Sequence, residues 1–201
     1  VYSYDDSTSS WRKRGNDIVG EDGDRLGSSG AVSLSADGWI VAVGSPGAGR
    51  EEEEEGSDGD GDGGGGGTNV GGQNLCAAGL SRGRVDVYSY NGVNDGWVRT
   101  TPREDPIILG DSPGDSLSVV SLSADGRRVA AGTALLEWSE EAGYVRVYDR
   151  IGGGNGVNGN NNGMWKLLGG TIVGHKQGER FGTSLSLSGD GYRLAVGGWT
   201  D

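Results

Sequence analysis

The sequence predicts an all-β fold: a β-propeller of four-stranded antiparallel blades, with about three blades' worth of strands present as part of a larger ring. Three observations predict it. The segment Val32–Gly38 returns without change at residues 120–126. Apolar and polar residues alternate in it, which is typical of a strand. An Asp-Gly pair closes both copies, and this pair is a strong hairpin signal.

The first two strands of the repeat are expected to form a hairpin around this Asp-Gly pair. A third copy of the first strand occurs at residues 185–191, and an apolar burst follows each copy, at residues 40–44, 129–132 and 194–197. Asp-Gly suits a two-residue type I′ turn, in which both central residues have positive φ. The pattern therefore predicts three hairpins of one kind.

The third and fourth strands complete the repeat. The third strand is expected at Gly83–Tyr88 and again at Gly143–Tyr148, and the opening residues Val1–Tyr4 are identical to Val87–Tyr90. The fourth element begins at a Trp and ends at a Gly. It is expected at residues 11–20, 97–110 and 165–174.

The order of these elements divides the chain into blades. Strands three and four come first, two complete sets follow, and strands one and two end the chain. Propellers usually close with about four to eight blades, so the chain is expected to be part of a ring cut from a longer protein. The expected boundaries are 1–22, 23–110, 111–174 and 175–201, with insertions at about 46–82 and 152–163 that are rich in Gly, Asn or acid.

Composition limits the partners. The 201 residues include 43 Gly and carry a formal net charge of −12. An acidic surface repels phosphates, so we expect no nucleic-acid partner. No apolar run approaches the length of a membrane span, so we expect no membrane insertion within this segment. The single cysteine, Cys76, excludes an internal disulfide.

Short Gly-rich motifs carry a resemblance to a known family. Gly178–Leu185, followed by Leu194–Gly198, resembles the FG-GAP repeat, the blade motif of the integrin α-subunit propeller. Gly23–Ser28 is a close variant in which Leu26 replaces the Phe, and the second blade has lost a Gly at Ser118. The resemblance covers nearly the whole chain outside the insertions. It implies cell adhesion through a protein or glycan partner, outside the cell or at its surface.

The chain departs from that family at the calcium loops. Many FG-GAP blades carry a long acidic loop between the first two strands, because Ca²⁺ takes six to eight oxygen ligands. Here the hairpin shrinks to four residues with one carboxylate, as at Ser35–Gly38. We therefore expect no cofactor and carry no calcium site over to any blade.

One acidic tract offers an alternative metal site. Asp58, Asp60 and Asp62 alternate with glycines as at the start of a calcium loop, but positions nine and twelve would be Gly66 and Asn69. Without a closing carboxylate, a flexible acidic tract is the favoured interpretation. Calcium binding at the three aspartates is the alternative.

Candidate ligand-contacting residues lie in the loops that precede the first strands. Asp24, Asp115 and Glu179 recur at one repeat position. Two interpretations stay open. The carboxylates fix the loop by binding turn amides or the neighbouring arginines, which is favoured, or they ring the propeller mouth and attract a cationic ligand.

Other candidates vary between the blades. The loops that contain Asp22, Asp111 and His175 differ between the blades, and variable loop residues are better candidates for ligand contacts. His175 is the only histidine and has no readable catalytic partner, so we assign no catalytic residue. Trp39, Trp138 and Trp199 are candidates for stacking on a sugar or a partner side chain, with blade packing favoured.

The functional hypothesis is a non-enzymatic interaction module that binds a protein or glycan through the loops of one propeller face. One alternative is a propeller enzyme, or an accessory domain of an enzyme, with part of the active site in missing blades. Another is an intracellular scaffold, similar in role to WD-repeat proteins. The Trp-Asp and Gly-His signatures of that family do not recur here.

Overall fold

The protein is built from β-strands alone, over the residues that its structure describes. The computed structural model describes residues 1–28, 31–48, 81–102, 108–133, 141–152 and 164–199. These residues hold no helix, and their strands form four antiparallel sheets of two to four strands with no closed barrel. The all-β prediction is therefore confirmed. None of these residues forms a helix of the length and apolar character needed to cross a bilayer.

The strands follow the chain in simple meanders. A two-stranded sheet comes first, then two four-stranded sheets in the orders β3-β4-β5-β6 and β7-β8-β9-β10, then a second two-stranded sheet. The bounds are β1 Tyr2–Asp5, β2 Ser10–Lys13, β3 Val32–Leu34, β4 Ile40–Ser45, β5 Arg84–Asn91, β6 Gly96–Arg99, β7 Leu117–Leu122, β8 Arg128–Thr133, β9 Tyr144–Ile151, β10 Met164–Val173, β11 Ser184–Leu187 and β12 Leu194–Gly197.

The fourth strands differ from one another more than the repeat predicts. β10 covers nearly the whole expected segment and carries a bulge between Leu168 and Ile172. β6 ends at Arg99, and Pro102, which has no amide proton for the ladder, follows shortly after. β2 ends at Lys13, and Gly15 with φ +71° turns the chain out of the sheet. The predictions for residues 11–20 and 97–110 are therefore too long.

The hairpin between the first two strands also differs from its predicted geometry. Positive φ occurs at Gly38, Gly126 and Gly191, but at none of the preceding aspartates, so the type I′ prediction is wrong. The amide of each glycine donates to the carbonyl of the serine three residues earlier. This hydrogen bond, with Ser first and Gly last, is typical of a type I turn.

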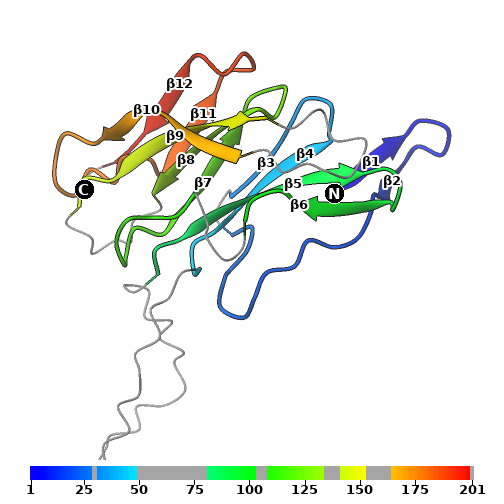
Figure 1. Cartoon of the computed structure of the whole chain (residues 1–201), viewed down its shortest axis with the longest axis horizontal. Coiled ribbons are helices and arrows are strands. Elements are labelled where there is room, and N and C mark those ends of the chain that lie inside the picture. Colours follow the sequence, from blue (N-terminus) through cyan, green and yellow to red (C-terminus); the bar gives the residue numbers. More distant parts are fainter. Residues whose placement is uncertain (29–30, 49–80, 103–107, 134–140, 153–163, 200–201) are drawn as a thin grey trace, which may run out of the picture.

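The main core lies between the two four-stranded sheets. It joins apolar side chains of β4 and β5 to those of β7, β8, β9 and β10. A second cluster on the other face of the first four-stranded sheet contains Val41, Val43 and Trp97, with Val1 and Ile18 packed against it. Figure 1 shows the sheets side by side, with β1 and β2 at one end of the row and β11 and β12 at the other.

Neighbouring sheets are joined by hydrogen bonds between their first strands. Ser33 of β3 accepts a hydrogen bond from the Leu122 amide of β7 at 2.9 Å. In the next pair of sheets, Ser121 of β7 accepts one from the Leu187 amide of β11 at 3.0 Å. The two contacts use equivalent residues. Successive sheets are therefore related by one repeated packing geometry.

Candidate functional site: the loops before each sheet

The loops that precede β3, β7 and β11 share one internal design. The Asp24 carboxylate accepts a hydrogen bond from the Glu21 amide at 3.0 Å, and Asp115 accepts one from the Ser112 amide at 2.9 Å. Glu179 accepts from the His175 amide at 2.6 Å and from the Lys176 amide at 3.1 Å. The hydrogen bonds from these two backbone amides lower the pKa of Glu179. The recurring acids thus fix the loop backbone.

The residue after each acid has left-handed backbone geometry. Arg25, Ser116 and Arg180 have φ of 53°, 48° and 50°. This region is uncommon for residues with a side chain and persists where the surroundings enforce it. Its recurrence in three loops of different sequence indicates one well-defined loop shape.

In each four-stranded sheet, the first residue of the third strand also contacts the acid of the loop. Arg84 of β5 forms an ion pair with Asp24 at 3.2 Å, and the Tyr144 hydroxyl of β9 donates to Asp115 at 2.7 Å. Burial, with the bond to Asp115, raises the pKa of Tyr144. Asp24 and Asp115 are only 6% and 2% exposed. Their burial favours the loop-fixing interpretation over ligand contact.

The variable tip residues lie at the surface. Asp22, Asp111 and His175 are all exposed. Asp111 forms an ion pair with Arg146, whose hydrogen bonds hold the pKa of Asp111 below its usual range. In Figure 1 the loops before β3 and β7 lie below the sheets, the loop before β11 lies at the left, and the hairpin turns between first and second strands lie at the upper end. Each loop thus lies at the end of its sheet opposite the hairpin turn.

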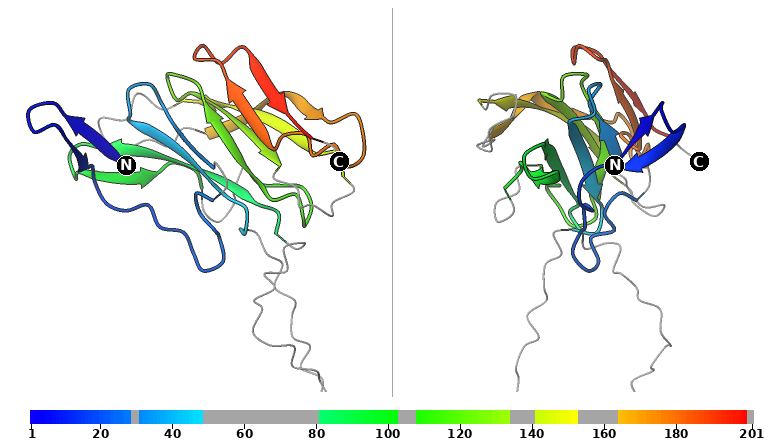
Figure 2. Two further views of the ribbon diagram at one scale, coloured as in Figure 1. Left: turned by 180° about the vertical axis from the view of Figure 1, so that it is seen from behind. Right: turned by 90° about the vertical axis from the view of Figure 1, so that its right-hand side faces the viewer.

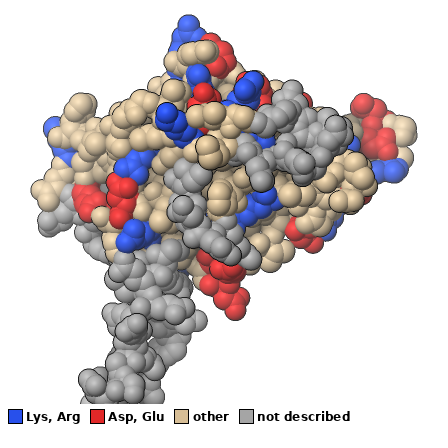
Figure 3. Space-filling view, viewed as in Figure 1, with Lys and Arg blue, Asp and Glu red and all other residues tan. Residues whose placement is uncertain are grey.

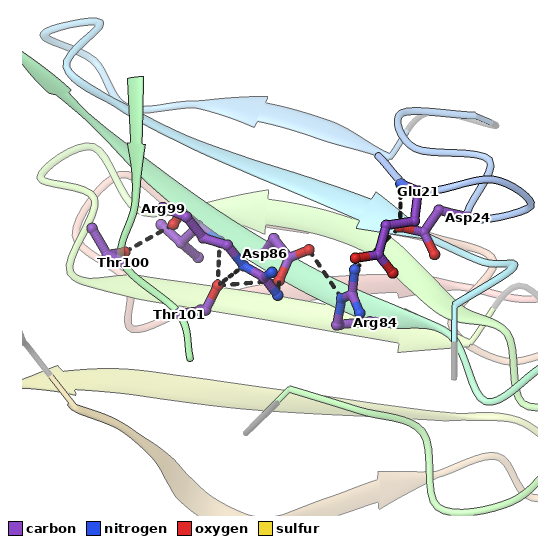
Figure 4. A network of polar contacts seen from close by, with 8 residues as sticks. Glu21, Asp24, Arg84, Asp86, Arg99, Thr100 and Thr101 are labelled. Carbon is purple, nitrogen blue, oxygen red and sulfur yellow. Dashed lines mark hydrogen bonds and ion pairs between the residues drawn. The ribbon is translucent and has the colours of Figure 1, made fainter. Parts of the chain in front are cut away.

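A buried charge network lies behind the first loop, and sequence reasoning missed it. Asp86 of β5 is 1% exposed and accepts hydrogen bonds from Arg84 at 3.0 Å, from Thr101 at 3.1 Å and from Arg99. Figure 4 shows Asp86 between the two arginines, with Arg84 continuing the network to Asp24. Asp86 alternates along β5 with Val85 and Val87, which point into the main core, so the period-two pattern gave no signal that its carboxylate would be buried.

Sequence reasoning also missed a cavity beside this network. It has a volume of about 430 Å³ and lies between residues 16–19 and strands β5 and β6. Tyr88, Trp97 and Arg99 form its strand side. The Trp97 indole is nearly buried and donates to the Arg14 carbonyl at 3.0 Å, so its ring serves packing.

Two of the candidate tryptophans carry a cation against one ring face. The Arg14 guanidinium lies 4.8 Å from the Trp39 ring centroid, and that of Arg180 lies 3.8 Å from Trp199. Both tryptophans stay partly exposed. Each guanidinium thus covers part of one ring by a cation–π contact. Trp138 and Cys76 lie outside the described residues.

Metal binding finds no support in the part of the chain that the structure describes. Those residues contain no group of three or more metal-ligating side chains. In the hairpin turn, the Asp37 carboxylate is already used by the Ser35 hydroxyl at 2.6 Å and the Trp39 amide at 3.0 Å. Asp58, Asp60 and Asp62 lie outside the described residues.

The electrostatic surface is mixed where it can be seen. Figure 3 shows Lys and Arg interspersed with Asp and Glu over the visible face, without a continuous area of one sign. Comparison with known proteins adds no identity: no protein family, no curated protein and no solved structure matches this sequence.

Proposed function

We propose that the chain is part of a β-propeller of the FG-GAP type, a non-enzymatic module that binds a protein or glycan partner through the loops at one end of its sheets. The strand order supports the propeller: each complete sheet is a four-stranded meander. The repeated contact between first strands supports it too, because the first strands of propeller blades meet near the axis.

The observation that carries the binding proposal is that each of the three loops contains an acid that fixes its backbone and an exposed residue that is available for contact. Buried or amide-bound acids hold a common backbone shape, as Asp24 and Asp115 illustrate. Exposed residues lie in the same loops: two are acidic, Asp22 and Asp111, and the third is His175. A rigid scaffold that displays variable side chains is how binding loops are commonly built.

The test measures binding of the full chain to immobilised glycans and to secreted and cell-surface proteins. A triple variant, Asp22→Ala with Asp111→Ala and His175→Ala, removes the tip chemistry. We expect it to lose about tenfold or more in affinity for the partner, with Tm within about 2 °C of the parent, because exposed tip residues contribute little to folding.

A matched control changes the opposite end of the sheets. Asp6→Ala with Asn94→Ala and Arg127→Ala alters three exposed residues in the turns of that end. We expect it to bind like the parent. Binding lost in this control and kept in the tip variant, or a tip variant that unfolds, would contradict the proposal.

A further inference from the structure

A cross-strand pair in the second four-stranded sheet joins a buried arginine to a buried tryptophan. Arg150 of β9 and Trp165 of β10 lie opposite each other in the ladder. Side chains directly opposite leave the same face of a sheet, with their Cβ atoms about 5 Å apart. Trp165 belongs to the main core, as does Tyr148, which shares this face two residues before Arg150. Arg150 and Trp165 are only 8% and 3% exposed.

The polar atoms of this pair have no partner in the part of the chain that the structure describes. Arg150 Nε, Arg150 Nη2 and Trp165 Nε1 are buried without a hydrogen-bond acceptor. Nε and Nη2 form one edge of the guanidinium, and this edge can donate two parallel hydrogen bonds to a carboxylate or a phosphate. Buried donors in native proteins are nearly always paired, and an exception calls for an explanation such as a bound ion. Three such donors on one face of two adjacent strands indicate a site for an acceptor group.

The charges near Arg150 do not neutralise it within the described residues. Burial lowers the pKa of Arg150, and the charge of Arg127 lowers it further. Arg127 is close because its carbonyl accepts a hydrogen bond from the Arg150 amide at 2.8 Å. Asp149, the next residue on β9, extends from the opposite face of the strand and lies 3.4 Å from Arg128. Because an arginine stays charged in proteins, the ligand that fits here is an anion.

The equivalent pair of the first four-stranded sheet has its acceptors within the protein. Tyr90 of β5 lies opposite Trp97 of β6. The Trp97 indole donates to the Arg14 carbonyl at 3.0 Å, and the Tyr90 hydroxyl donates to Asp95. In the second sheet a guanidinium replaces the neutral phenol, and the indole has no such acceptor among the described residues. The need for an anionic group is therefore a feature of the Arg150 pair.

We propose that Arg150 and Trp165 form a binding site for an oxyanion, in which the guanidinium edge and the indole N–H donate to the oxygens of one carboxylate, sulfate or phosphate group. The bound group supplies the negative charge and the acceptors that the pair lacks. These three groups share the chemistry that the site recognises, because each presents two oxygens at the spacing of the guanidinium edge.

The site lies between two complete sheets and near the surface. The sheet β7–β10 has the first four-stranded sheet on one side and the hairpin β11–β12 on the other (Figure 2). Ile151 and Met164, the next pair along the same two strands, are exposed. The buried pair is thus one residue away from the exposed end of the β9–β10 ladder, which gives an ion a short path.

This proposal goes beyond the binding function proposed above. Arg150 lies beside the β7–β8 turn, at the end of its sheet opposite the loop that contains Asp111. Changes to the oxyanion site therefore leave the exposed loop residues in place. Either proposal can fail without the other.

The test titrates the isotope-labelled full chain with sodium sulfate, phosphate or acetate, at an ionic strength held constant with chloride. Nuclear magnetic resonance follows the indole N–H of Trp165. We expect its resonance to shift and to saturate at millimolar concentration with at least one of the three anions. The Trp97 indole, which already donates to the Arg14 carbonyl, is the internal control and should keep its position. A drift without saturation, or equal shifts of both indoles, would overturn the proposal.

The three titrations also distinguish the sources of the oxyanion. Tightest binding of acetate supports the site and identifies a carboxylate as its ligand. Tightest binding of sulfate or phosphate supports the site and identifies a tetrahedral anion.

A substitution tests the role of the guanidinium. Arg150→Met removes the charge and keeps a long side chain, so the half-saturating anion concentration should rise about tenfold or more, because charge-assisted hydrogen bonds are the strong ones. Arg193→Met, at an exposed position just before β12, is the matched control and should bind like the parent. Unchanged binding by Arg150→Met would contradict the assignment.

Thermal unfolding gives an independent measurement. In chloride, Arg150→Met should melt at or above the Tm of the parent, because a buried charge without a counter-charge opposes folding. The best-bound oxyanion should raise the Tm of the parent more than that of Arg150→Met, since a ligand of the folded state stabilises it. Equal gains in the two proteins would indicate a general salt effect. That result, or a lower Tm of Arg150→Met in chloride, would rule out the site.

Discussion

At the scale of residues, equivalent positions of the repeat carry opposite charges, each neutralised by local partners. Asp86 of β5 and Arg146 of β9 occupy the same position in the third strand. Asp86 is buried between Arg84 and Arg99, whereas Arg146 pairs with the exposed Asp111. A position can therefore change its charge between repeats when its neighbours change with it.

The first prediction concerns the buried carboxylate. Asp86→Asn leaves the two arginines beside a neutral amide, so the free energy of unfolding should fall by about 3–5 kcal/mol, the usual cost of breaking a buried ion pair. Urea unfolding followed by fluorescence measures it. Asp6→Asn, at an exposed turn, is the control and should change little. An Asp86→Asn protein as stable as the parent would show that the network does not hold the sheet.

The second prediction concerns pH. Hydrogen bonds from Arg146 lower the pKa of folded Asp111 below its unfolded value of about 3.9. Its contribution to stability is therefore present above that value and is lost as the pH falls through the lower, folded pKa. The pair is exposed on the Asp111 side, so its contribution should stay below about 1 kcal/mol.

The measurement compares the parent with Asp111→Asn across this range. We expect the parent to be slightly more stable at neutral pH and the difference to disappear at strongly acidic pH. A difference that grows on acidification would contradict the assigned direction of the pKa shift.

At the scale of elements, one hairpin turn recurs between the first and second strands. In the second four-stranded sheet, the Asp125 carboxylate accepts from the Ser123 hydroxyl at 2.6 Å and from the Arg127 amide at 3.0 Å. The same serine accepts from the Arg128 amide at 2.9 Å. The turns around Asp37 and Asp190 repeat this pattern. The Asp-Gly pair predicts the position of this turn, and hydrogen bonds from the Ser and Asp side chains fix its conformation.

The third prediction removes this carboxylate. Asp125→Ala deletes two hydrogen bonds and leaves the nearly buried Ser123 hydroxyl without that acceptor, so stability should fall by about 1–2 kcal/mol. Asp125→Asn keeps an acceptor oxygen and should recover most of the loss. Thermal unfolding distinguishes the two variants. If Asn were as damaging as Ala, the carboxylate would act through its charge instead of these hydrogen bonds.

At the scale of the whole molecule, successive sheets approach each other at backbone distance. A Cβ atom added to Gly44 of β4 would lie 1.9 Å from the Ser118 carbonyl oxygen. A Cβ on Gly132 of β8 would lie 2.3 Å from the Gly182 carbonyl oxygen. The two glycines are equivalent in the repeat, and each marks the place where the second strand meets the next sheet. The sheets can approach this closely only because glycine has no Cβ atom at this position.

The fourth prediction tests this packing. Gly44→Ala forces two backbone segments apart, so it should cost about 3 kcal/mol or more, at or beyond the upper end of overpacking effects. Gly170→Ala is the matched control, since a Cβ there meets nothing within 4 Å. Chemical unfolding of both variants measures the difference. Comparable stabilities would show that the sheets can separate without cost.

The sequence alone determined the strands and their order. Alternating apolar residues and the Asp-Gly pairs are local features, and they located the three hairpins and the third strands at residues 83–88 and 143–148. They also placed Asp22, Asp111 and His175 in the loops before the first strands. The turn type and the lengths of the fourth strands were predicted wrongly although their causes are local: a Ser–Asp hydrogen bond between residues two apart, and Pro102 shortly after β6.

Only the tertiary structure decided burial and pairing. Asp24 meets Arg84 across 60 residues of sequence, and Leu122 meets Ser33 across 89. No local pattern shows which of several similar residues will meet. Val32 and Val120 occupy the same position of an identical segment, yet they differ in exposure for this reason. Val120 packs against the first four-stranded sheet and is 6% exposed, whereas Val32 is 55% exposed. The repeat determines the strands of each sheet, and the neighbouring sheets determine which of its residues are buried and which contacts they make.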